Sequence, residues 1–166
     1  QRMFVGLNSF LLISVPLFIL AGNLMDACGI TPRIVNFSNM LVGRIRGGLS
    51  YVTLVAMDFS SGITGAGAAD TAAIGSFMIP VMIKEGYKAE YAAGLTAVGA
   101  TVGPIIPPSI AFVIYGAMTE VSIADLFLAG FIPGFMFTLA LMGVARYYAV
   151  KQNHPVRVIE VTWKGF

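Results

Sequence analysis

Long apolar segments separated by short polar ones make up this chain. Residues 9–27 and 126–150 are each long enough to cross a bilayer, which takes about 20 apolar residues in a helix. Two further apolar segments, 49–83 and 89–118, are interrupted near the middle by glycine or proline. Apolar runs of this length indicate buried or membrane helices. We therefore expect an all-α polytopic membrane protein whose first transmembrane helix lies within residues 1–27.

Residues 28–48 have a different pattern, in which apolar side chains recur at helical spacing. Thr31 and Pro32 are typical of a helix N-cap followed by proline in the first turn. The apolar positions are Ile34, Phe37, Leu41 and Ile45, and the polar ones are Arg33, Asn36, Arg44 and Arg46. This pattern predicts an amphipathic helix lying along the membrane interface. A solvated connector is the alternative.

The segment 49–83 consists of two short apolar halves, 49–61 and 68–83, around a glycine-rich break. Basic residues flank it on both sides, with Arg44 and Arg46 before it and Lys84 and Lys88 after it. Because cytoplasmic loops carry an excess of Lys and Arg, this charge pattern favours two cytoplasmic ends. We therefore predict a re-entrant helical hairpin. One broken helix that crosses the membrane fully is the alternative.

The segment 89–118 is predicted to be a discontinuous transmembrane helix, and with the hairpin it forms a transport-type unit over residues 49–118. Its halves, 89–99 and 109–118, each reach roughly 16 Å as helix, or half a bilayer. The loop 119–125 is acidic and has no Lys or Arg, as expected outside the cell. A return transmembrane helix within 119–150 then leads to a cytoplasmic linker at 151–166. We expect His154, in this polar tail, to be a surface residue.

Composition supports the membrane assignment. The chain has 57% hydrophobic and 11% charged residues, whereas a soluble domain carries about 25% charged residues. The net charge of +2 is too small to indicate a nucleic-acid partner. The sequence has no Ser/His pairing, acidic dyad or metal-ligand cluster, so we do not expect an enzyme.

The prolines of the second break create candidate ligands for a cation. A proline cannot donate to the carbonyl four residues earlier. Pro104, Pro107 and Pro108 should therefore release the carbonyls of Ala100, Gly103 and Pro104. Uncharged oxygens of this kind bind Na⁺ in transporters with broken helices. A plain proline kink, satisfied by a neighbouring Ser or Thr, is the alternative.

The first break adds hydroxyl groups. We predict a Na⁺ site between the two breaks, with ligands from Ser61, Gly62, Thr64, Ala100, Gly103 and Pro104. The second half-helix begins near Ala68, and its free N–H groups favour an anionic substrate group at the tip. We expect substrate contacts from Thr64, Gly65, Pro107, Pro108 and Ser109.

Two acidic residues lie close to the first break. Asp70 is expected either to complement the helix dipole or to belong to the ion site. Asp58 lies one turn before the break, and an ionisable residue inside a membrane segment is a functional candidate by default. Pairing with a basic residue elsewhere is the alternative for Asp58.

Four sequence blocks resemble the large membrane subunit of tripartite ATP-independent periplasmic (TRAP) transporters, within the wider ion-transporter superfamily. The blocks are Pro16–Met25, Gly62–Gly75, Ile79–Tyr87 and Gly103–Ser109, and the resemblance extends over most of residues 1–150. The chain departs from the family at the hairpin tip. Many members carry Ser-Gly-Ser where this chain has Thr64-Gly65-Ala66. The loss of a hydroxyl at Ala66 argues against a side-chain ligand at that position.

The resemblance implies an elevator-type secondary transporter in the cytoplasmic (inner) membrane of a bacterium or archaeon. In such a system Na⁺ drives uptake of a small organic acid, such as a C4-dicarboxylate or sialic acid. A periplasmic substrate-binding protein delivers the acid, and a small membrane subunit accompanies the large one. The resemblance also implies two inverted repeats, of which this chain matches the first. We expect a second repeat beyond Phe166.

Two other functions are compatible with the sequence. One is a Na⁺/dicarboxylate symporter of the same superfamily that needs no binding protein. The other is a structural membrane subunit without an ion path, and the two breaks argue against it. Unwound backbone in a membrane is costly, and a scaffold gains nothing from it.

Overall fold

The computed structural model describes residues 16–17, 19–22, 24, 27–152 and 154. Its helices of at least ten residues are α3 (Ile30–Val42), α4 (Gly48–Thr64), α5 (Gly67–Lys84), α6 (Ala89–Ala100), α7 (Ile110–Thr119) and α8 (Ile123–Lys151). Within the described ranges every regular element is helical, so the all-α prediction is confirmed there. Most of the predicted first transmembrane helix, 1–27, and of the predicted linker, 151–166, lies outside the described residues.

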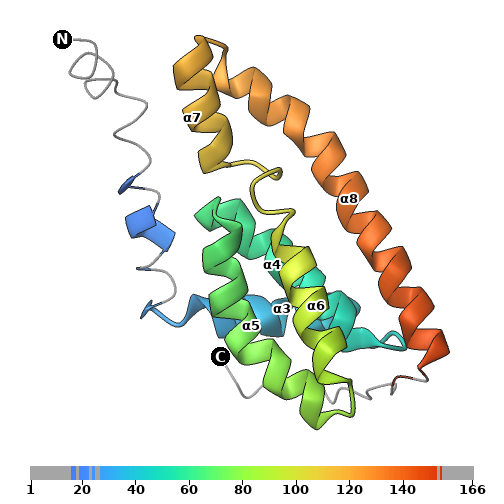
Figure 1. Cartoon of the computed structure of the whole chain (residues 1–166). Helices are drawn as coiled ribbons and strands as arrows, with labels where there is room; N and C mark the ends of the chain where they lie inside the picture. Colours follow the sequence, from blue (N-terminus) through green and yellow to red (C-terminus); the bar gives the residue numbers. More distant parts are fainter. Residues whose placement is uncertain (1–15, 18, 23, 25–26, 153, 155–166) are drawn as a thin grey trace.

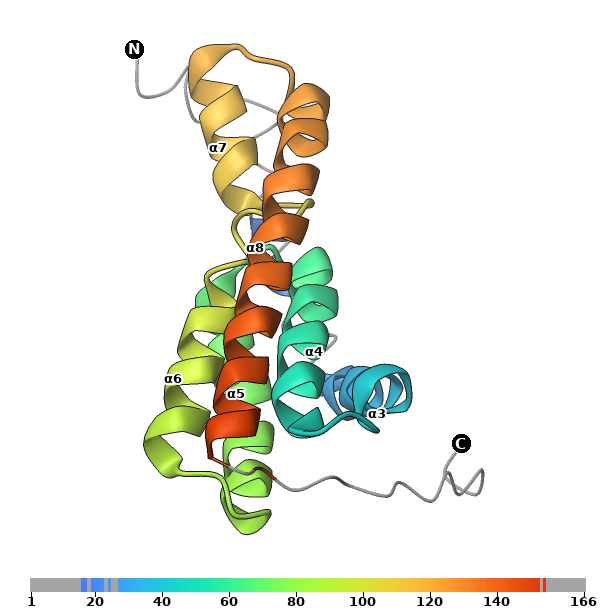
Figure 2. The ribbon, with the colours of Figure 1, turned by 90° about the vertical axis from the view of Figure 1, so that its right-hand side faces the viewer.

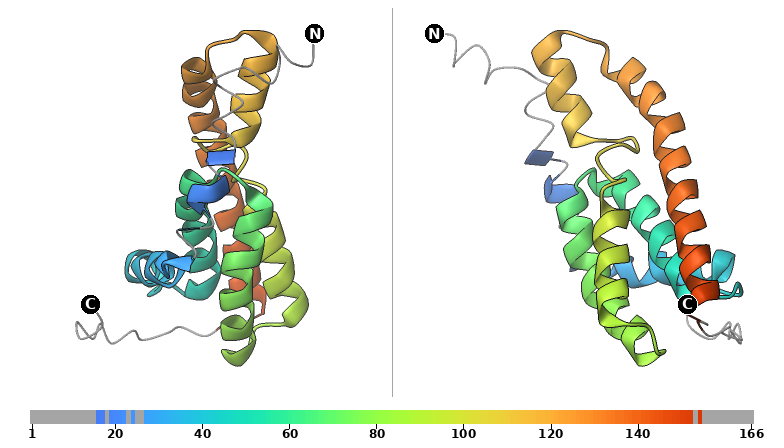
Figure 3. Two further views of the ribbon diagram at one scale, coloured as in Figure 1. Left: turned by 90° about the vertical axis from the view of Figure 1, so that its left-hand side faces the viewer. Right: turned by 45° about the vertical axis from the view of Figure 1, so that its right-hand side comes forward.

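Helices α4 and α5 form an antiparallel hairpin, and α6 packs along both of them (Figure 1). Beyond an irregular segment, α7 continues the general direction of α6. Helix α8 then returns alongside α7, α6 and α4 to the end where the hairpin began (Figure 3). Helix α3 lies across the base of α4 (Figure 2). The tip of the hairpin therefore meets the break between α6 and α7 beside the middle of α8.

The hairpin turn is only two residues long. Gly65 adopts a left-handed conformation with φ of 60°, and its N–H donates to the Ser61 carbonyl at 2.8 Å. This is a common way to end a helix, because glycine has no Cβ to clash there. Ala66 is extended, and α5 begins at Gly67. The longer break predicted from the sequence was wrong, because α4 continues through the glycine-rich stretch to Thr64.

Helix α3 begins earlier than the sequence pattern predicted and buries few of its side chains against the protein. Left-handed Gly29 precedes Ile30, so the predicted N-cap at Thr31 was wrong. The buried side chains of α3 are Val35 and Ser38. The apolar positions Phe37, Leu41 and Ile45 are exposed, as the apolar side of a helix lying on a membrane interface would be, so the interfacial helix stays a prediction. The Phe37 ring meets only the edge of Phe59, with ring centroids 5.5 Å apart.

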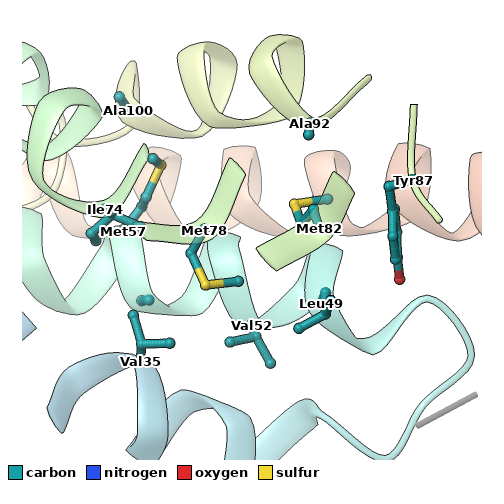
Figure 4. Close-up of a cluster of buried hydrophobic side chains, with 11 residues drawn as sticks. Val35, Leu49, Val52, Met57, Ile74, Met78, Met82, Tyr87, Ala92 and Ala100 are labelled. Atoms are coloured by element: carbon teal, nitrogen blue, oxygen red, sulfur yellow. The ribbon is translucent and has the colours of Figure 1, made fainter. Parts of the chain in front are cut away.

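The hydrophobic core lies between α4, α5 and α6, with one contribution from α3 (Figure 4). Its fully buried members include Val52 and Met57 from α4 and Ile74 and Met82 from α5. Close approach of α6 depends on Gly99, where a Cβ would lie 2.8 Å from the Met57 sulfur. The core thus fixes the two arms of the hairpin against the first half of the broken helix.

Aromatic rings cover His154 at the base of the hairpin. The His154 ring lies 4.2 Å from the Tyr87 ring and 5.1 Å from the Tyr91 ring, measured between centroids. Its backbone N–H donates to the Ala149 carbonyl at 3.0 Å, and its side chain is buried. The expectation of a surface histidine was wrong, because the turn between α5 and α6 folds over this position.

Charge is distributed unevenly between the two ends of the molecule. Exposed basic residues gather where the hairpin begins and ends and where α8 ends, namely Arg44, Arg46, Lys84, Lys88, Arg146 and Lys151. The opposite end, between α7 and α8, carries exposed Glu120 and Asp125. Among the described residues α8 is the one helix long and apolar enough to cross a membrane, and α7 is a shorter apolar helix.

Candidate ion and substrate site at the two helix breaks

The second break comprises residues 101–109 and is built from short turns. The Val102 carbonyl accepts from the N–H groups of Ile105 and Ile106, at 2.9 and 3.0 Å. Ser109 ends the break as the N-cap of α7, accepting from the Phe112 N–H at 3.3 Å. The segment therefore has a defined shape although it is not helical.

Two of the carbonyls that the prolines were predicted to release have donors within the break. The Ala100 carbonyl accepts from the Gly103 N–H at 3.2 Å. The Pro104 carbonyl accepts from the Ser109 hydroxyl at 2.6 Å. Because a carbonyl oxygen has two lone pairs, each still has acceptor capacity. Turn geometry and a cap thus supply new donors to carbonyls that the prolines release, and the Ser109 bond matches the alternative of a kink satisfied by a neighbouring serine.

Glycines at the hairpin tip allow the second break to come into direct contact with it. A Cβ on Gly65 would lie 2.7 Å from the Pro108 carbonyl oxygen and 3.1 Å from the Ile110 nitrogen. A Cβ on Gly62 would lie 3.9 Å from the Pro107 carbonyl oxygen. The predicted substrate residues Gly65 and Pro108 are therefore neighbours across the two breaks, and Thr64 and Pro107 adjoin them along the chain.

Three of the predicted ion ligands, Ser61, Ala100 and Gly103, lie close together where α5 begins against the end of α6. A Cβ on Gly67 would overlap the Ala100 carbonyl oxygen, so this oxygen rests on the glycine backbone. A Cβ on Gly103 would lie 2.8 Å from the Ser61 hydroxyl oxygen and 3.2 Å from the Ala100 oxygen. A hydroxyl from α4 and a carbonyl from α6 thus both lie close to Gly103. Among the described residues, no group of three His, Cys, Asp or Glu side chains could hold a metal ion.

Asp70 is fully buried and receives hydrogen bonds from three hydroxyl groups of α4. Ser60 donates to Oδ1 at 2.5 Å, and Ser61 donates to Oδ2 at 2.8 Å. The Thr64 hydroxyl lies 3.0 Å from both carboxylate oxygens. The backbone N–H of Ala66 in turn donates to the Thr64 hydroxyl at 3.3 Å. Asp70 therefore connects the first turn of α5 to the last turns of α4 across the hairpin tip.

Sequence reasoning named Asp70 but missed this arrangement. The hydroxyls lie on α4 itself and not in a loop, and helical spacing brings Ser60, Ser61 and Thr64 to the face of α4 that Asp70 contacts. The hairpin turn at Gly65 was the signal that could have identified it. Asp58 also has a partner that sequence did not predict: the Thr138 hydroxyl of α8 donates to its Oδ1 at 3.1 Å.

Gly22, from the segment before α3, is a further residue at this site. A Cβ on Gly22 would lie 3.2 Å from the Thr64 methyl carbon. Gly22 and Thr64 also line one small cavity together with Ile30, Thr31, Ile34, Ser60 and Ile63. Gly22 belongs to the block Pro16–Met25 that resembles the TRAP family, and the sequence alone did not place it near the tip.

A helical hairpin that meets a broken helix, in a chain this apolar, defines a membrane transport protein. Residues 1–164 match the family described as "Tripartite ATP-independent periplasmic transporter, DctM component". The chain therefore belongs to this family of transporter permease subunits, which are not enzymes.

Named relatives agree with this assignment. The chain is 43% identical over 93% of its length to the sialic acid TRAP transporter permease protein SiaT of Haemophilus influenzae, and covers 25% of that protein. It is 41% identical over 100% of its length to the 2,3-diketo-L-gulonate TRAP transporter large permease protein YiaN of Escherichia coli, and covers 40% of it. It is 38% identical over 93% of its length to the C4-dicarboxylate TRAP transporter large permease protein DctM of Pseudomonas aeruginosa, and covers 36% of that protein. The chain thus spans about a quarter to two fifths of the length of these relatives.

Proposed function

We propose that this chain is part of the permease subunit of a Na⁺-coupled transporter that imports a small organic acid. Membership of the TRAP permease family supports the class of substrate, since the relatives are named for sialic acid, 2,3-diketo-L-gulonate and C4-dicarboxylates. A periplasmic substrate-binding protein and a small membrane subunit are the proposed partners. The proposed location is the inner membrane of a bacterium or archaeon.

The observation that carries the proposal is the contact between the two breaks. Ser61 and Ala100 bring a hydroxyl and a carbonyl oxygen together beside Gly103. Neutral oxygens from unwound backbone and helix ends are suited to Na⁺. We propose that Ser61, Gly62 and Thr64 bind the ion from the hairpin, and that Ala100, Gly103 and Pro104 bind it from the second break.

We propose that the substrate carboxylate binds at the hairpin tip. The tip presents the N-terminus of α5, where unpaired N–H groups and the helix dipole favour an anion. Thr64 and Gly65 supply the tip, and Pro107, Pro108 and Ser109 form the facing wall. We propose that the hairpin enters the membrane from the cytoplasmic side and returns to it. Transport then occurs by an elevator movement of this hairpin.

Two substitutions test the ion site in the full-length permease, reconstituted in proteoliposomes with its small subunit and binding protein. Thr64→Val keeps the side-chain shape and removes one oxygen, so the apparent Na⁺ affinity should fall about tenfold or more, as expected when a bond worth over 1.4 kcal/mol is lost. Pro107→Ala should let helix form across the break and reduce transport. A Na⁺ titration of substrate uptake measures both effects.

Matched controls lie elsewhere in the same helices. Thr53→Val makes the same substitution at a buried threonine of α4 whose hydroxyl bonds to the Leu49 carbonyl, away from the tip. Pro80→Ala removes a proline from inside α5. Both controls should keep the wild-type Na⁺ dependence. If Thr64→Val and Pro107→Ala also keep it, the ion binds elsewhere and the breaks act only as hinges.

A further inference from the structure

We propose that Asp70 is a positioning residue that orients the hydroxyl groups of the Na⁺ site; this rests on the ion site proposed above. The carboxylate is fully buried, with 0% exposure, and accepts hydrogen bonds from Ser61 and Thr64, of which the Ser61 hydroxyl lies beside Gly103 of the second break. Asp70 therefore acts on the ion through these hydroxyls and does not itself need to touch it.

Hydroxyl and carboxylate groups differ in the number of protons that they can donate to hydrogen bonds. A hydroxyl has one proton to donate and two lone pairs, whereas an ionised carboxylate accepts hydrogen bonds and donates none. Three hydroxyl donors around one carboxyl group match the ionised form, whose two oxygens have room for all of them. Ser61 and Thr64 must then give their single protons to Asp70.

Each hydroxyl oxygen keeps two lone pairs, and these can bind a cation. With its proton held by Asp70 at 2.8 Å, the Ser61 oxygen can offer only lone pairs to the region beside Gly103 and the Ala100 carbonyl. Without Asp70 the hydroxyl could rotate and donate to that carbonyl, which would place a proton where the ion should bind. The negative charge of the carboxylate also attracts a cation held one layer of atoms away.

Ser60 serves as a comparison for the two hydroxyl groups that are proposed to bind the ion. It donates to the same carboxylate at 2.5 Å, whereas the hydroxyl that lies beside Gly103 of the second break is that of Ser61. Removal of the Ser60 hydroxyl should therefore weaken the attachment of α5 to α4 without removing an ion ligand. A purely structural role of Asp70 predicts that Ser60→Ala and Asp70→Asn behave alike, whereas a positioning role predicts that they differ in Na⁺ affinity.

The decisive variant is Asp70→Asn in the full-length permease, assayed in proteoliposomes with its partner subunits. Asparagine replaces one acceptor oxygen by an NH₂ donor, so at least one hydroxyl must accept from it and turn its proton elsewhere. We expect the apparent Na⁺ affinity to fall about tenfold or more, the scale of one lost charge-assisted hydrogen bond. The KM for substrate at saturating Na⁺ should stay within about twofold of the wild type, a change of less than 0.5 kcal/mol.

Three variants assayed together separate the outcomes. Ser60→Ala should lower the unfolding temperature but keep the apparent Na⁺ affinity, and Thr64→Val should reduce that affinity. If Thr64→Val reduces Na⁺ affinity and Asp70→Asn behaves like Ser60→Ala, the positioning role is overturned and the ion site stands. If neither Thr64→Val nor Asp70→Asn changes Na⁺ affinity, the ion site itself is wrong.

A second substitution keeps the test available if Asp70→Asn does not accumulate in the membrane. Asp70→Glu retains the carboxylate but moves it by one methylene, so it cannot keep all three hydroxyl contacts. We expect an apparent Na⁺ affinity between those of the wild type and Thr64→Val. Wild-type Na⁺ affinity in Asp70→Glu would overturn the proposal.

Discussion

Single atoms decide how closely the two breaks approach each other. At Gly65 the backbone has φ of 60° and the neighbouring break lies within van der Waals distance. At Gly86, in the turn between α5 and α6, φ is 89° but no atom lies within 4 Å of the position of a Cβ. Both glycines therefore have a left-handed backbone. Only Gly65 also lacks room for a side chain.

This difference predicts unequal effects of one substitution. Gly86→Ala should cost about 1–2 kcal/mol of stability, because L-residues are strained in the left-handed region. Gly65→Ala carries the same strain and also places a methyl group 2.7 Å from the Pro108 oxygen. We expect the lower unfolding temperature, and the loss of Na⁺-dependent uptake, in Gly65→Ala. Thermal unfolding of the purified full-length permease gives the comparison, and equal unfolding temperatures would show that the tip can open without penalty.

At the scale of whole helices, hydrophobic pattern predicted which segments are helical but not how they end. The predicted halves 89–99 and 109–118 correspond closely to α6 and α7, because prolines block helix formation between them whatever surrounds them. The extent of α4 could not be read in the same way. Glycine permits both helix and turn, so the sequence alone did not show that Gly62 is helical and that Gly65 ends the helix.

The hydrophobic pattern also did not predict which residues of α3 pack against the protein. Apolar spacing placed Phe37 and Leu41 on one side of the helix, where both are exposed, whereas Val35 and Ser38 are the residues buried against the protein. A crossing helix contacts its neighbour over a short patch, and small residues such as Ser38 allow the closest approach there. The same reasoning explains the candidate site: residue types identified the oxygens, whereas the partnership of Asp70 with three hydroxyls required the fold.

The end of α8 carries a pH dependence of its own. Burial lowers the pKa of His154 below its ordinary value of 6.5. The unfolded chain therefore binds this proton more readily, and the contribution of His154 to stability is complete above pH 6.5 and is lost as pH falls towards the lowered pKa. His154→Phe keeps an aromatic ring against Tyr87 and Tyr91 but cannot titrate.

The expected result is a flatter stability profile in His154→Phe. The unfolding temperature of the full-length permease in detergent, measured from about pH 8 to about pH 5 across the titration range of histidine, should decline less than that of the wild type. Parallel declines in the two proteins would mean that other groups account for the acid sensitivity.

For the molecule as a whole, the described helices have a basic end and an acidic end. The base of the hairpin and the C-terminal end of α8 share the basic end, and the short connection between α7 and α8 lies at the other (Figure 1). Because Lys and Arg are retained on the cytoplasmic side, this arrangement supports an orientation with the hairpin entering from the cytoplasm.

Site-directed labelling tests that orientation. Single cysteines at Arg46 and Lys88, both exposed, should react with a membrane-impermeant reagent from the cytoplasmic face. A cysteine at Glu120 should react from the periplasmic face and serves as the matched position at the opposite end. The background is a full-length protein in which Cys28 is replaced. Labelling of Arg46→Cys and Lys88→Cys from opposite faces would make 49–83 a crossing segment.

The hydrogen bond between Asp58 and Thr138 has a mechanical consequence. It joins the outer half of the hairpin to the middle of α8, and few waters are present at membrane depth to replace it. If the hairpin moves as a gate, this bond must either break in every cycle or carry α8 along. A hydrogen bond to a charged group contributes about 1.5–3 kcal/mol, so an ionised Asp58 favours the second course, in which α8 is carried along. The moving body would then include the long helix as well as the hairpin.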